Sequence, residues 1–578
     1  MIKKLNTILD RGQKTRIIGL MIMTFIGGLL ETAGVSLVLP LIDAVLDEEA
    51  FAKKEYVVFL MNLLRIENVK KFIYFMLIGL VLIFVLKNAY LVLLTYLQSR
   101  FANRNRSRCT TNLLVQFLNK PYEDYLFEET SVIIRTIYGD MDNIFNLLIQ
   151  CMNLAVELVV SFCIGVYLLV VDIKMMITIC GLLGIVTILI TKVIKPKMSK
   201  VGDDSRDSLA GMYQWILQPI MGIKDVKVLH KEPYFRDRFG EQAGRYAKNQ
   251  IVNNVLTALP RQLIETVTIA GVLGYVGVSM AFGVEMSALA PLVAAFGVAA
   301  MKLLPSVNRI NTYMANIAYF EPALNHIYEE FGVHAMDKTT LQSGNEPKAK
   351  ELEITKEIKL DGITYAYPNT EKKIFDKADM IIPVGKSVGV MGPSGSGKTT
   401  IIDILLGLLQ VQEGKITTDG RDIFENYASW LSHVGYIPQT IYMLDASIKE
   451  NIAFGVDVDK IDEERVWKVL EQAQMKEFVM EQPEGLDSQI GERGVRISGG
   501  QRQRLGIARA LYHDPELMIF DEATSALDNE TEEAIMEAID ALHGQKTLVI
   551  IAHRLRTIEN CDIIYEVRDG KIEQRESI

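Results

Sequence analysis

The sequence predicts two parts of different fold class. The first is an all-α membrane domain of six transmembrane helices with long cytoplasmic extensions, and the second is a soluble α/β domain. Long apolar segments fill residues 1–335, whereas residues 336–350 lose this pattern and gain Gly, Pro and charge. A glycine-rich loop between a buried strand and a helix marks residues 351–578 as α/β. We therefore expect a membrane domain, a linker and a soluble domain over these three ranges.

The membrane domain is predicted from six apolar segments, each long enough to cross a hydrocarbon layer of about 30 Å. They lie near residues 17–42, 72–97, 145–170, 175–194, 260–282 and 287–308. Short connections follow the third and fifth segments, and long polar arms with a helical pattern follow the second and fourth. The fourth and sixth segments alone could be buried helices of a soluble protein, but six in one half of a chain favour membrane spans.

Basic residues indicate which side of the membrane the long arms face. Arg100, Arg104, Arg106 and Arg108 follow the second segment. Because Lys and Arg are enriched on the cytoplasmic side, we expect the arms, both ends of the membrane domain and the soluble domain to be cytoplasmic. Between the first two segments, residues 56–64 form a short apolar stretch flanked by lysines. This stretch predicts either a helix in the outer membrane interface or an ordinary packed loop helix.

Charged residues inside the apolar segments predict a function or a partner. An ionised side chain facing lipid costs about 2.5–3.5 kcal/mol, so each should face a cavity or an opposite charge. Lys87, Lys302 and Arg309 could hold an anionic head group such as a diphosphate in a central cavity. Alternatively, the cations could pair with the acidic residues and hold the helices together. The acidic residues are Glu31, Glu157 and Glu265, and Arg261 is a further cation.

The glycine-rich loop predicts a nucleotide-phosphate site. It fits G-x-x-x-x-G-K-[ST] and lies between the apolar strand 388–391 and an apolar helix that begins near Lys398. Glycines let successive backbone N–H groups point at phosphates, and the helix N-terminus favours negative charge. Lys398 can reach the β- and γ-phosphates, and Thr399 can bind Mg²⁺. The residues of the predicted loop are Gly392, Pro393, Ser394, Gly395, Ser396, Gly397, Lys398, Thr399 and Thr400.

The overall charge excludes one class of function. The net charge is −10 and the pI is about 5.5. An acidic chain of this kind is not expected to bind nucleic acid through phosphate contacts.

After the phosphate loop, further motifs resemble those of the ATP-binding cassette family and follow in its order. The segment Ile497-Ser498-Gly499-Gly500-Gln501 is similar to the cassette signature, with isoleucine in place of the usual leucine. Gln439 in GYIPQ matches the Q-loop, and Leu517–Phe520 followed by Asp521-Glu522 resembles the Walker B strand. The remaining matches are Gly491–Gly494 (x-loop), Ser525–Asp528 (D-loop), His553 (switch histidine) and Tyr367 (adenine-stacking aromatic).

The resemblance implies a role for each matched residue. Glu522 would polarise the attacking water, with His553 and Gln439 as its catalytic companions. Thr399, Gln439 and Asp521 would hold Mg²⁺. Tyr367 and the phosphate loop would bind ATP of the same chain, and the signature residues Ser498, Gly499, Gly500 and Gln501 would bind ATP of a second subunit. Because one chain carries one cassette, the family pattern implies a homodimer with two composite sites.

Six spans ahead of one cassette resemble the half-transporters among type I ABC exporters, which have the type IV fold. Residues 130–142 and 215–228 are similar to the coupling helices of that class. LETAGVSLVLPLIDAVL and KLLPSVNRI resemble segments of bacterial lipid-linked oligosaccharide flippases of protein N-glycosylation. The resemblance implies an ATP-driven translocase in the inner (plasma) membrane that moves a polyprenyl-diphosphate oligosaccharide. Export of another lipid, a peptide or a drug is the alternative.

Overall fold

A computed structural model of the protein describes residues 1–36, 55–64, 66, 68–171, 173–281, 286–331, 351–522, 529–552 and 558–575. The chain divides into two compact units. Unit 1 comprises Met1–Lys120 and Glu128–Ser343, and unit 2 comprises Pro121–Phe127 and Gly344–Ile578. Each unit is described by itself.

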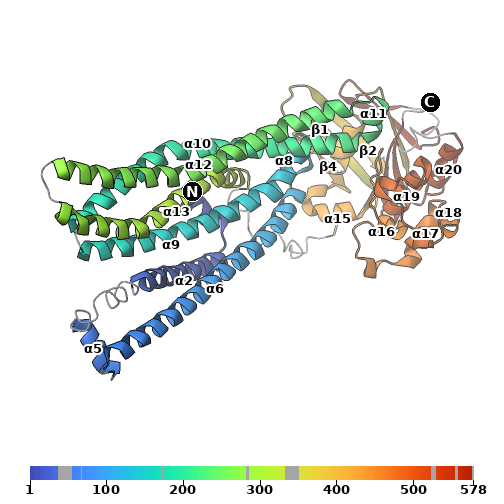
Figure 1. Ribbon diagram of the computed structural model, residues 1–578. Helices are drawn as coiled ribbons and strands as arrows, with labels where there is room; N and C mark the ends of the chain where they lie inside the picture. Colours follow the sequence, from blue (N-terminus) through green and yellow to red (C-terminus); the bar gives the residue numbers. More distant parts are fainter. Residues whose placement is uncertain are drawn as a thin grey trace. The chain divides into compact units, whose positions relative to one another are not determined.

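Unit 1 is entirely helical in its described residues, and six long helices dominate it (Figure 1). These are α2 (Arg11–Ser36), α6 (Val69–Leu118), α9 (Met141–Val171), α10 (Ile173–Met221), α12 (Glu232–Ala281) and α13 (Met286–Phe331). The shorter ones are α1 (Ile2–Ile8), α5 (Glu55–Leu64), α8 (Thr130–Ile134), the π-helix η1 (Arg135–Asp140) and α11 (Ile223–Val228). Each predicted membrane segment falls on one long helix, although residues 37–42 of the first and residue 282 of the fifth lie outside the described part.

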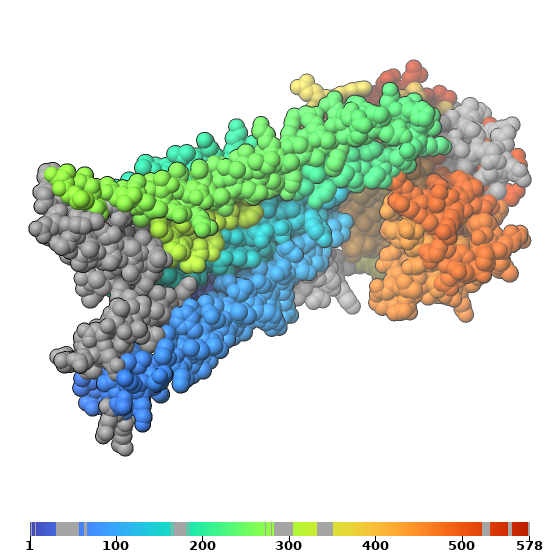
Figure 2. Space-filling model, in the orientation of Figure 1, coloured from blue at the N-terminus to red at the C-terminus, as the bar shows by residue number. Residues whose placement is uncertain are grey.

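The long helices extend well beyond the predicted membrane segments, as the polar helical arms of the sequence suggest. At 1.5 Å per residue, the 50 residues of α6 span about 75 Å, more than twice the hydrocarbon thickness. Within the described residues, α6 and residues 130–162 are long and apolar enough to cross a membrane. The outward face of α6, blue in Figure 2, carries exposed Ile78, Val81, Leu82, Val85 and Leu86. Apolar side chains exposed in this number are expected of a helix that faces lipid.

Helices α9, α10 and α13 form the packed centre of unit 1. Met198, Ala315 and Ala318 belong to one buried cluster between α10 and α13. At Gly202 of α10 the two helices approach so closely that an added Cβ would lie 2.0 Å from the backbone oxygen of Tyr319. Only glycine fits this contact without a shift of the backbone.

The connecting segments include two stretches that the sequence singles out. Residues 55–64 form the predicted short helix α5, which buries Val57 against Phe72 while Phe59 stays exposed. Residues 130–142, which resemble a coupling helix, form α8 and η1, continue directly into α9 and pack against α10 inside unit 1. The segment Pro121–Phe127, which contains α7 (Tyr122–Tyr125), groups with unit 2.

Unit 2 contains two β-sheets. The four-stranded antiparallel sheet has the order β2-β1-β4-β5, and the six-stranded sheet has the order β10-β9-β3-β8-β7-β6. The strands are β1 (Glu357–Ala366), β2 (Lys373–Pro383), β3 (Ser387–Met391), β4 (Glu413–Thr418), β5 (Arg421–Asp422), β6 (Val434–Ile437), β7 (Leu517–Asp521), β8 (Thr547–Ile551), β9 (Ile563–Arg568) and β10 (Lys571–Arg575).

Helices complete unit 2. They are α14 (Lys398–Leu405), α15 (Tyr427–Ser432), α16 (Ile448–Ile452), α17 (Glu463–Gln472), α18 (Lys476–Met480), α19 (Gly499–Leu511) and α20 (Asn529–Asp540). One buried cluster includes side chains of α14 and of β1 and β2, and a second includes side chains of α16, α17 and α19. The predicted α/β fold class is therefore confirmed.

The larger sheet brings several predicted site residues to one edge. Strands β3, β8, β7 and β6 are parallel neighbours, and every residue of β7 and β8 is buried. In this register Val390 and Asp521 both lie beside Ile551. The phosphate loop after β3, Glu522 after β7 and Gln439 after β6 therefore follow the carboxyl ends of parallel strands, where ligands of such sheets bind.

Candidate functional site

The phosphate loop has the backbone that its glycines predict. Gly395 and Gly397 have φ angles of 77° and 105°, and Gly397 caps the N-terminus of α14. An added Cβ at Gly392 would lie 2.4 Å from the backbone oxygen of Val567, so this position has no room for a side chain. The loop therefore curls at a helix N-terminus, which is the arrangement that binds phosphate.

Lys398 folds back over the loop. Its Nζ donates hydrogen bonds to the backbone oxygens of Gly392 and Pro393, both at 3.0 Å, and the residue is buried. Burial lowers the pKa of Lys398, although the nearby Glu522 and Asp521 carboxylates oppose this shift. The ammonium is thus held by two neutral carbonyls within the field of two acids, and an incoming phosphate would supply a stronger partner.

Asp521 and Glu522 end β7 with two different environments. Asp521 is only 3% exposed. Glu522 has a φ of 49°, and its Oε2 accepts a hydrogen bond of 2.7 Å from Nε2 of Gln439. The left-handed backbone turns Glu522 away from the line of the strand, where its side chain meets the end of β6. The structure therefore brings Gln439 and Glu522 together across β6 and β7.

The acidic edge of this site fits a divalent cation. Oδ1 of Asp521 and Oγ of Ser396 are buried and have no hydrogen-bond partner in the described part of the chain. Burial, and then the neighbouring Glu522, raise the pKa of Asp521 to about 6. Oxygen donors that are buried and unsatisfied are the ligands that Mg²⁺ prefers, directly or through water. Thr399, another predicted ligand, is exposed on the first turn of α14.

Tyr367 and Thr400 border the other side of the loop. The hydroxyl groups of Tyr367 and Thr400 are 3.0 Å apart, and the Tyr367 ring packs edge-on against Tyr365. The ring of Tyr367 is only partly buried. It therefore presents an aromatic surface next to the phosphate loop, as an adenine-binding residue would.

The signature residues form a helix start of their own. Ser498 caps α19 through a capping box with Gln501, whose side chain accepts from the Ser498 backbone at 2.8 Å. Ser498 and Gly499 are exposed, and Gly500 is buried. Among the described residues, no hydrogen bond joins this segment to the phosphate loop of the same chain. Residues 525–528 and His553, which were predicted to complete the site, lie outside the described part.

One acidic residue near the phosphate loop was missed by sequence reasoning. Asp403 lies on α14, and burial, with Asp521 nearby, raises its pKa to about 6. The only available signal was a carboxylate within the apolar pattern IIDILL, where an exposed helix face would have been the ordinary interpretation. Asp403 adds a second proton-binding carboxyl to the acidic edge.

The predicted cations of the membrane segments have different surroundings. Arg309 Nε lies 2.6 Å from Oε1 of Glu157, which is buried, while the Arg309 side chain is 42% exposed. Lys87 lies over the ring of Phe84 on the same helix, at 4.9 Å from its centroid. Lys302 lies in α13, but its side chain is outside the described part. For Arg309, the structure therefore shows the helix-pairing alternative.

Comparisons with known proteins match a different family model to the helical part of the chain and to the α/β part. The family model described as ABC transporter transmembrane region matches residues 17–288, and the one described as ABC transporter matches residues 375–525. An Atm1-family ABC exporter from a bacterium, solved with ATP bound, has a TM-score of 0.76 at 21% identity. That match covers 98% of this chain and 96% of the other.

The curated relatives match over part of their length. An ATP-dependent lipid A-core flippase of Photorhabdus laumondii is 31% identical over 67% of this chain and 65% of its own. An enzyme of the same description from Pectobacterium atrosepticum is 41% identical over 39% of each chain. The mitochondrial iron-sulfur clusters transporter atm1 of Aspergillus fumigatus is 38% identical over 43% of this chain and 36% of its own. The chain thus spans less than two thirds of the length of these relatives.

Proposed function

The chain belongs to the ABC exporters, and from that premise we propose that it hydrolyses ATP to move a lipid-linked, phosphate-bearing substrate across a membrane. The observation that carries the ATPase proposal is that Lys398 lies close to Asp521 and Glu522, and that Gln439 donates a hydrogen bond to Glu522. The match of residues 17–288 to a transmembrane region supports coupling to transport. We place the protein in the inner (plasma) membrane, with its cassette in the cytoplasm.

The chemistry assigns a role to each residue. Lys398 leaves the carbonyls of Gly392 and Pro393 and binds the β- and γ-phosphates. Glu522, held by Gln439, accepts a hydrogen bond from the attacking water and takes up its proton. When bound, Mg²⁺ neutralises phosphate charge, and Asp521, Thr399 and Gln439 would hold it. His553 would contact the γ-phosphate, and Tyr367 would stack on the adenine.

We also propose that the working unit is a homodimer. Ser498, Gly499, Gly500 and Gln501 lie at the start of α19, and no hydrogen bond joins them to the phosphate loop within the described residues. ATP bound to a second copy of the chain would place a phosphate at this helix N-terminus. Mixing Lys398→Ala chains with Ser498→Arg chains tests this arrangement, because a heterodimer keeps one intact composite site. Restored ATP binding in the mixture supports the homodimer, whereas its absence in purified heterodimers contradicts it.

For the substrate, we propose a polyprenyl-diphosphate-linked oligosaccharide. Three cations on apolar helices, Lys87, Lys302 and Arg309, support an anionic head group. Lys302 and Arg309 are seven residues apart, so they lie on nearly one face of α13. The pairing of Arg309 with Glu157 leaves much of the arginine exposed, so a diphosphate could still reach it. The likeness to lipid A-core flippases favours a second candidate, a phosphorylated glycolipid with acyl chains.

Flipping assays in vesicles separate the two candidates. Purified protein would be reconstituted with fluorescent polyprenyl-diphosphate oligosaccharide or with labelled lipid A core, with Glu522→Gln protein as the inactive control. ATP-dependent movement of the first lipid alone supports the proposal, and movement of the second alone replaces it. Lys302→Gln combined with Arg309→Gln should abolish flipping while basal ATPase and melting temperature change little. A collapse of the melting temperature would show that these cations hold the bundle instead.

A further inference from the structure

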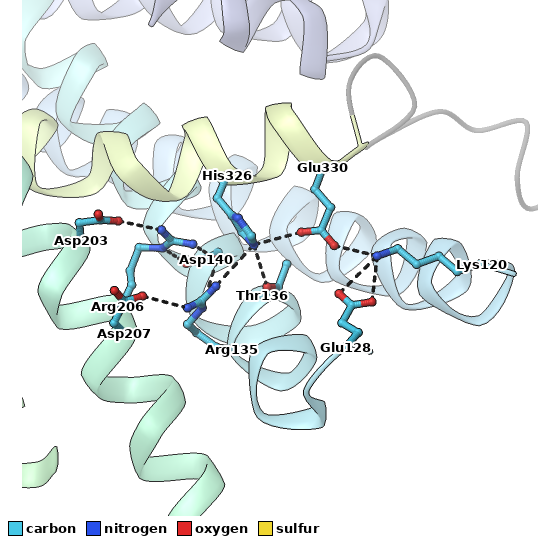
Figure 3. Close-up of polar contacts among 10 residues, drawn as sticks. All are labelled: Lys120, Glu128, Arg135, Thr136, Asp140, Asp203, Arg206, Asp207, His326 and Glu330. Atoms are coloured by element: carbon cyan, nitrogen blue, oxygen red, sulfur yellow. Dashed lines mark hydrogen bonds and ion pairs between the residues drawn. The ribbon is translucent and has the colours of Figure 1, made fainter. Parts of the chain in front are cut away.

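A network of charged side chains joins four elements of unit 1 near the end of α13. We call it the His326 network (Figure 3). It draws on the connection between α6 and α8, on η1, on α10 and on α13. Its members are Lys120, Glu128, Arg135, Thr136, Asp140, Asp203, Arg206, Asp207, His326 and Glu330. The nucleotide site uses none of them.

One half of the network is fixed by a buried, two-point ion pair. Nε and Nη2 of Arg206 donate to the two oxygens of Asp140 at 2.7 and 2.9 Å. Asp140 is fully buried, and Arg135 Nε lies 3.7 Å from it. Two exposed carboxylates, Asp203 and Asp207, complete this half. The pair connects η1 with α10 by the strongest geometry available to charged side chains.

A second fixed tie lies at the other end. Lys120 Nζ is 2.8 Å from Glu330 and 3.1 Å from Glu128, and it lies over the rings of Phe117 and Phe331. Burial alone would raise the pKa of Glu330, but hydrogen bonds from His326 and Lys120 outweigh it and hold the pKa at about 2. Glu330 therefore stays ionised near neutral pH and keeps Lys120 bound.

His326 lies between these two fixed ties, and a single ring nitrogen faces both. Its Nε2 is 3.0 Å from Oε2 of Glu330, 3.3 Å from Oγ1 of Thr136 and 3.5 Å from Nη2 of Arg135. The guanidinium can only donate, the carboxylate can only accept, and the hydroxyl can do either. In the neutral tautomer that carries its proton on Nδ1, Nε2 accepts from Arg135 or Thr136, whereas in the imidazolium Nε2–H donates to Glu330.

The two states differ in which helices they connect. Arg135 and Thr136 belong to η1, so the unprotonated state ties α13 to a second helix. Glu330 lies one turn further along α13 itself, so protonation replaces a contact between helices with one inside a helix. A proton taken from water onto Nε2 is the only bond change required. Histidine is also the side chain whose protonation ordinarily changes between about pH 5 and 8.

We propose that His326 is a positioning residue of the transport cycle, which ties the end of α13 to η1 when Nε2 is unprotonated and releases it when Nε2 carries a proton. Helix α13 ends at Phe331, and the chain then enters the linker to the cassette. When α13 is released from η1, movements of the helix bundle are coupled less tightly to the linker. Acidification therefore lowers the transport obtained per ATP, and this consequence alone rests on the proposed ATP-driven transport.

A distance measurement without nucleotide tests the proposal separately from the transport function. Spin labels at positions 138 on η1 and 329 on α13, both exposed, would be introduced after replacement of the five native cysteines. We expect one distance at pH 8 and a second component at pH 6 that is longer by about 2 Å, the scale of helix shifts in switching transitions. His326→Gln keeps a donor and an acceptor but cannot titrate, so its distances should not change with pH.

Three further arms complete the experiment. His326→Lys carries a permanent cation beside Glu330 and should show the longer component at both pH values. His513→Gln, at an exposed cassette histidine, should respond like the wild type. If the cysteine-free protein fails to fold, hydrogen–deuterium exchange of residues 130–145 and 321–331 gives the same comparison in wild type and His326→Gln. A pH response that persists in His326→Gln, or none in the wild type, would overturn the proposal.

Discussion

Buried charges serve opposite purposes in the two units. In unit 1, Asp140 is fully buried and receives two hydrogen bonds from Arg206. In unit 2, Asp521 is almost as deeply buried, yet one carboxylate oxygen has no partner among the described residues. Asp140, whose two oxygens are both hydrogen-bonded, costs little free energy as it stands and holds η1 against α10. The unsaturated acid is costly by itself, and a ligand relieves that cost. A charge left unsatisfied thus marks a binding site more reliably than a charge that is paired.

The largest effect is expected on ATP turnover at the nucleotide site of unit 2. Glu522→Gln removes the proposed base for the attacking water, so ATP turnover should fall by about 10²–10⁴-fold. ATP binding should persist, because Lys398 and the phosphate loop are untouched. Turnover by phosphate release and binding by equilibrium dialysis are the measurements. Glu559→Gln, an exposed carboxylate in the same unit, is the matched control. Near-normal turnover in Glu522→Gln would show that another residue is the base.

The saturated site should respond in stability instead of turnover. Asp140→Asn keeps the shape of the side chain but leaves Arg206 and Arg135 buried without their anion, at a cost of about 3–5 kcal/mol. Thermal unfolding in detergent measures this loss. Asp207→Asn alters the same network at an exposed position, 3.4 Å from Arg135, and should cost less than about 1 kcal/mol. Equal losses in the two variants would contradict the distinction between buried and exposed members.

The smallest effect concerns the pH dependence of the nucleotide-free cassette. Burial raises the pKa of Asp521 from 3.8 to about 6, so the folded protein binds a proton that the unfolded chain has lost. The raised pKa stabilises the fold below about pH 4, and that stability is lost as the pH rises through about 6. The melting temperature should therefore fall by about 2–4 °C from pH 5 to pH 7, the shift that 1 kcal/mol gives in a domain of this size.

Asp521→Asn serves as the control for this pH effect. Asparagine cannot titrate, so the variant should keep only the slope that Asp403, with a similarly raised pKa, contributes. Saturating Mg²⁺ and ATP should also flatten the slope in the wild type, because a bound cation replaces the proton. An identical slope in Asp521→Asn would mean that other groups cause it.

The sequence predicted unit 2 better than unit 1 for a physical reason. Phosphate binding needs glycines, a lysine and a hydroxyl at fixed spacing in the sequence. The buried strand before Asp521 is likewise predicted by an unbroken run of apolar residues. The long helices of unit 1 are equally clear from the length of their apolar segments. Their partners were not, because a charge in an apolar segment shows that a partner is needed without naming it. Arg309 was proposed as a substrate contact, and only the fold shows Glu157 beside it.

The His326 network shows the same limit more strongly. Its members come from four elements separated by up to about two hundred residues, so spacing along the chain carries no signal of them. The π-helix η1, which carries Arg135 and Asp140, has no sequence signature of its own. Residues 525–528 and 553 lie outside the described part of the chain, so the D-loop and the switch histidine stay predictions.

The contact at Gly202 bears on how such a protein can diversify. Its backbone meets that of Tyr319 with no side chain between, so main-chain atoms alone fix the spacing of α10 and α13 there. Substitutions elsewhere along the two helices can reshape a cavity for a different cargo without altering that spacing.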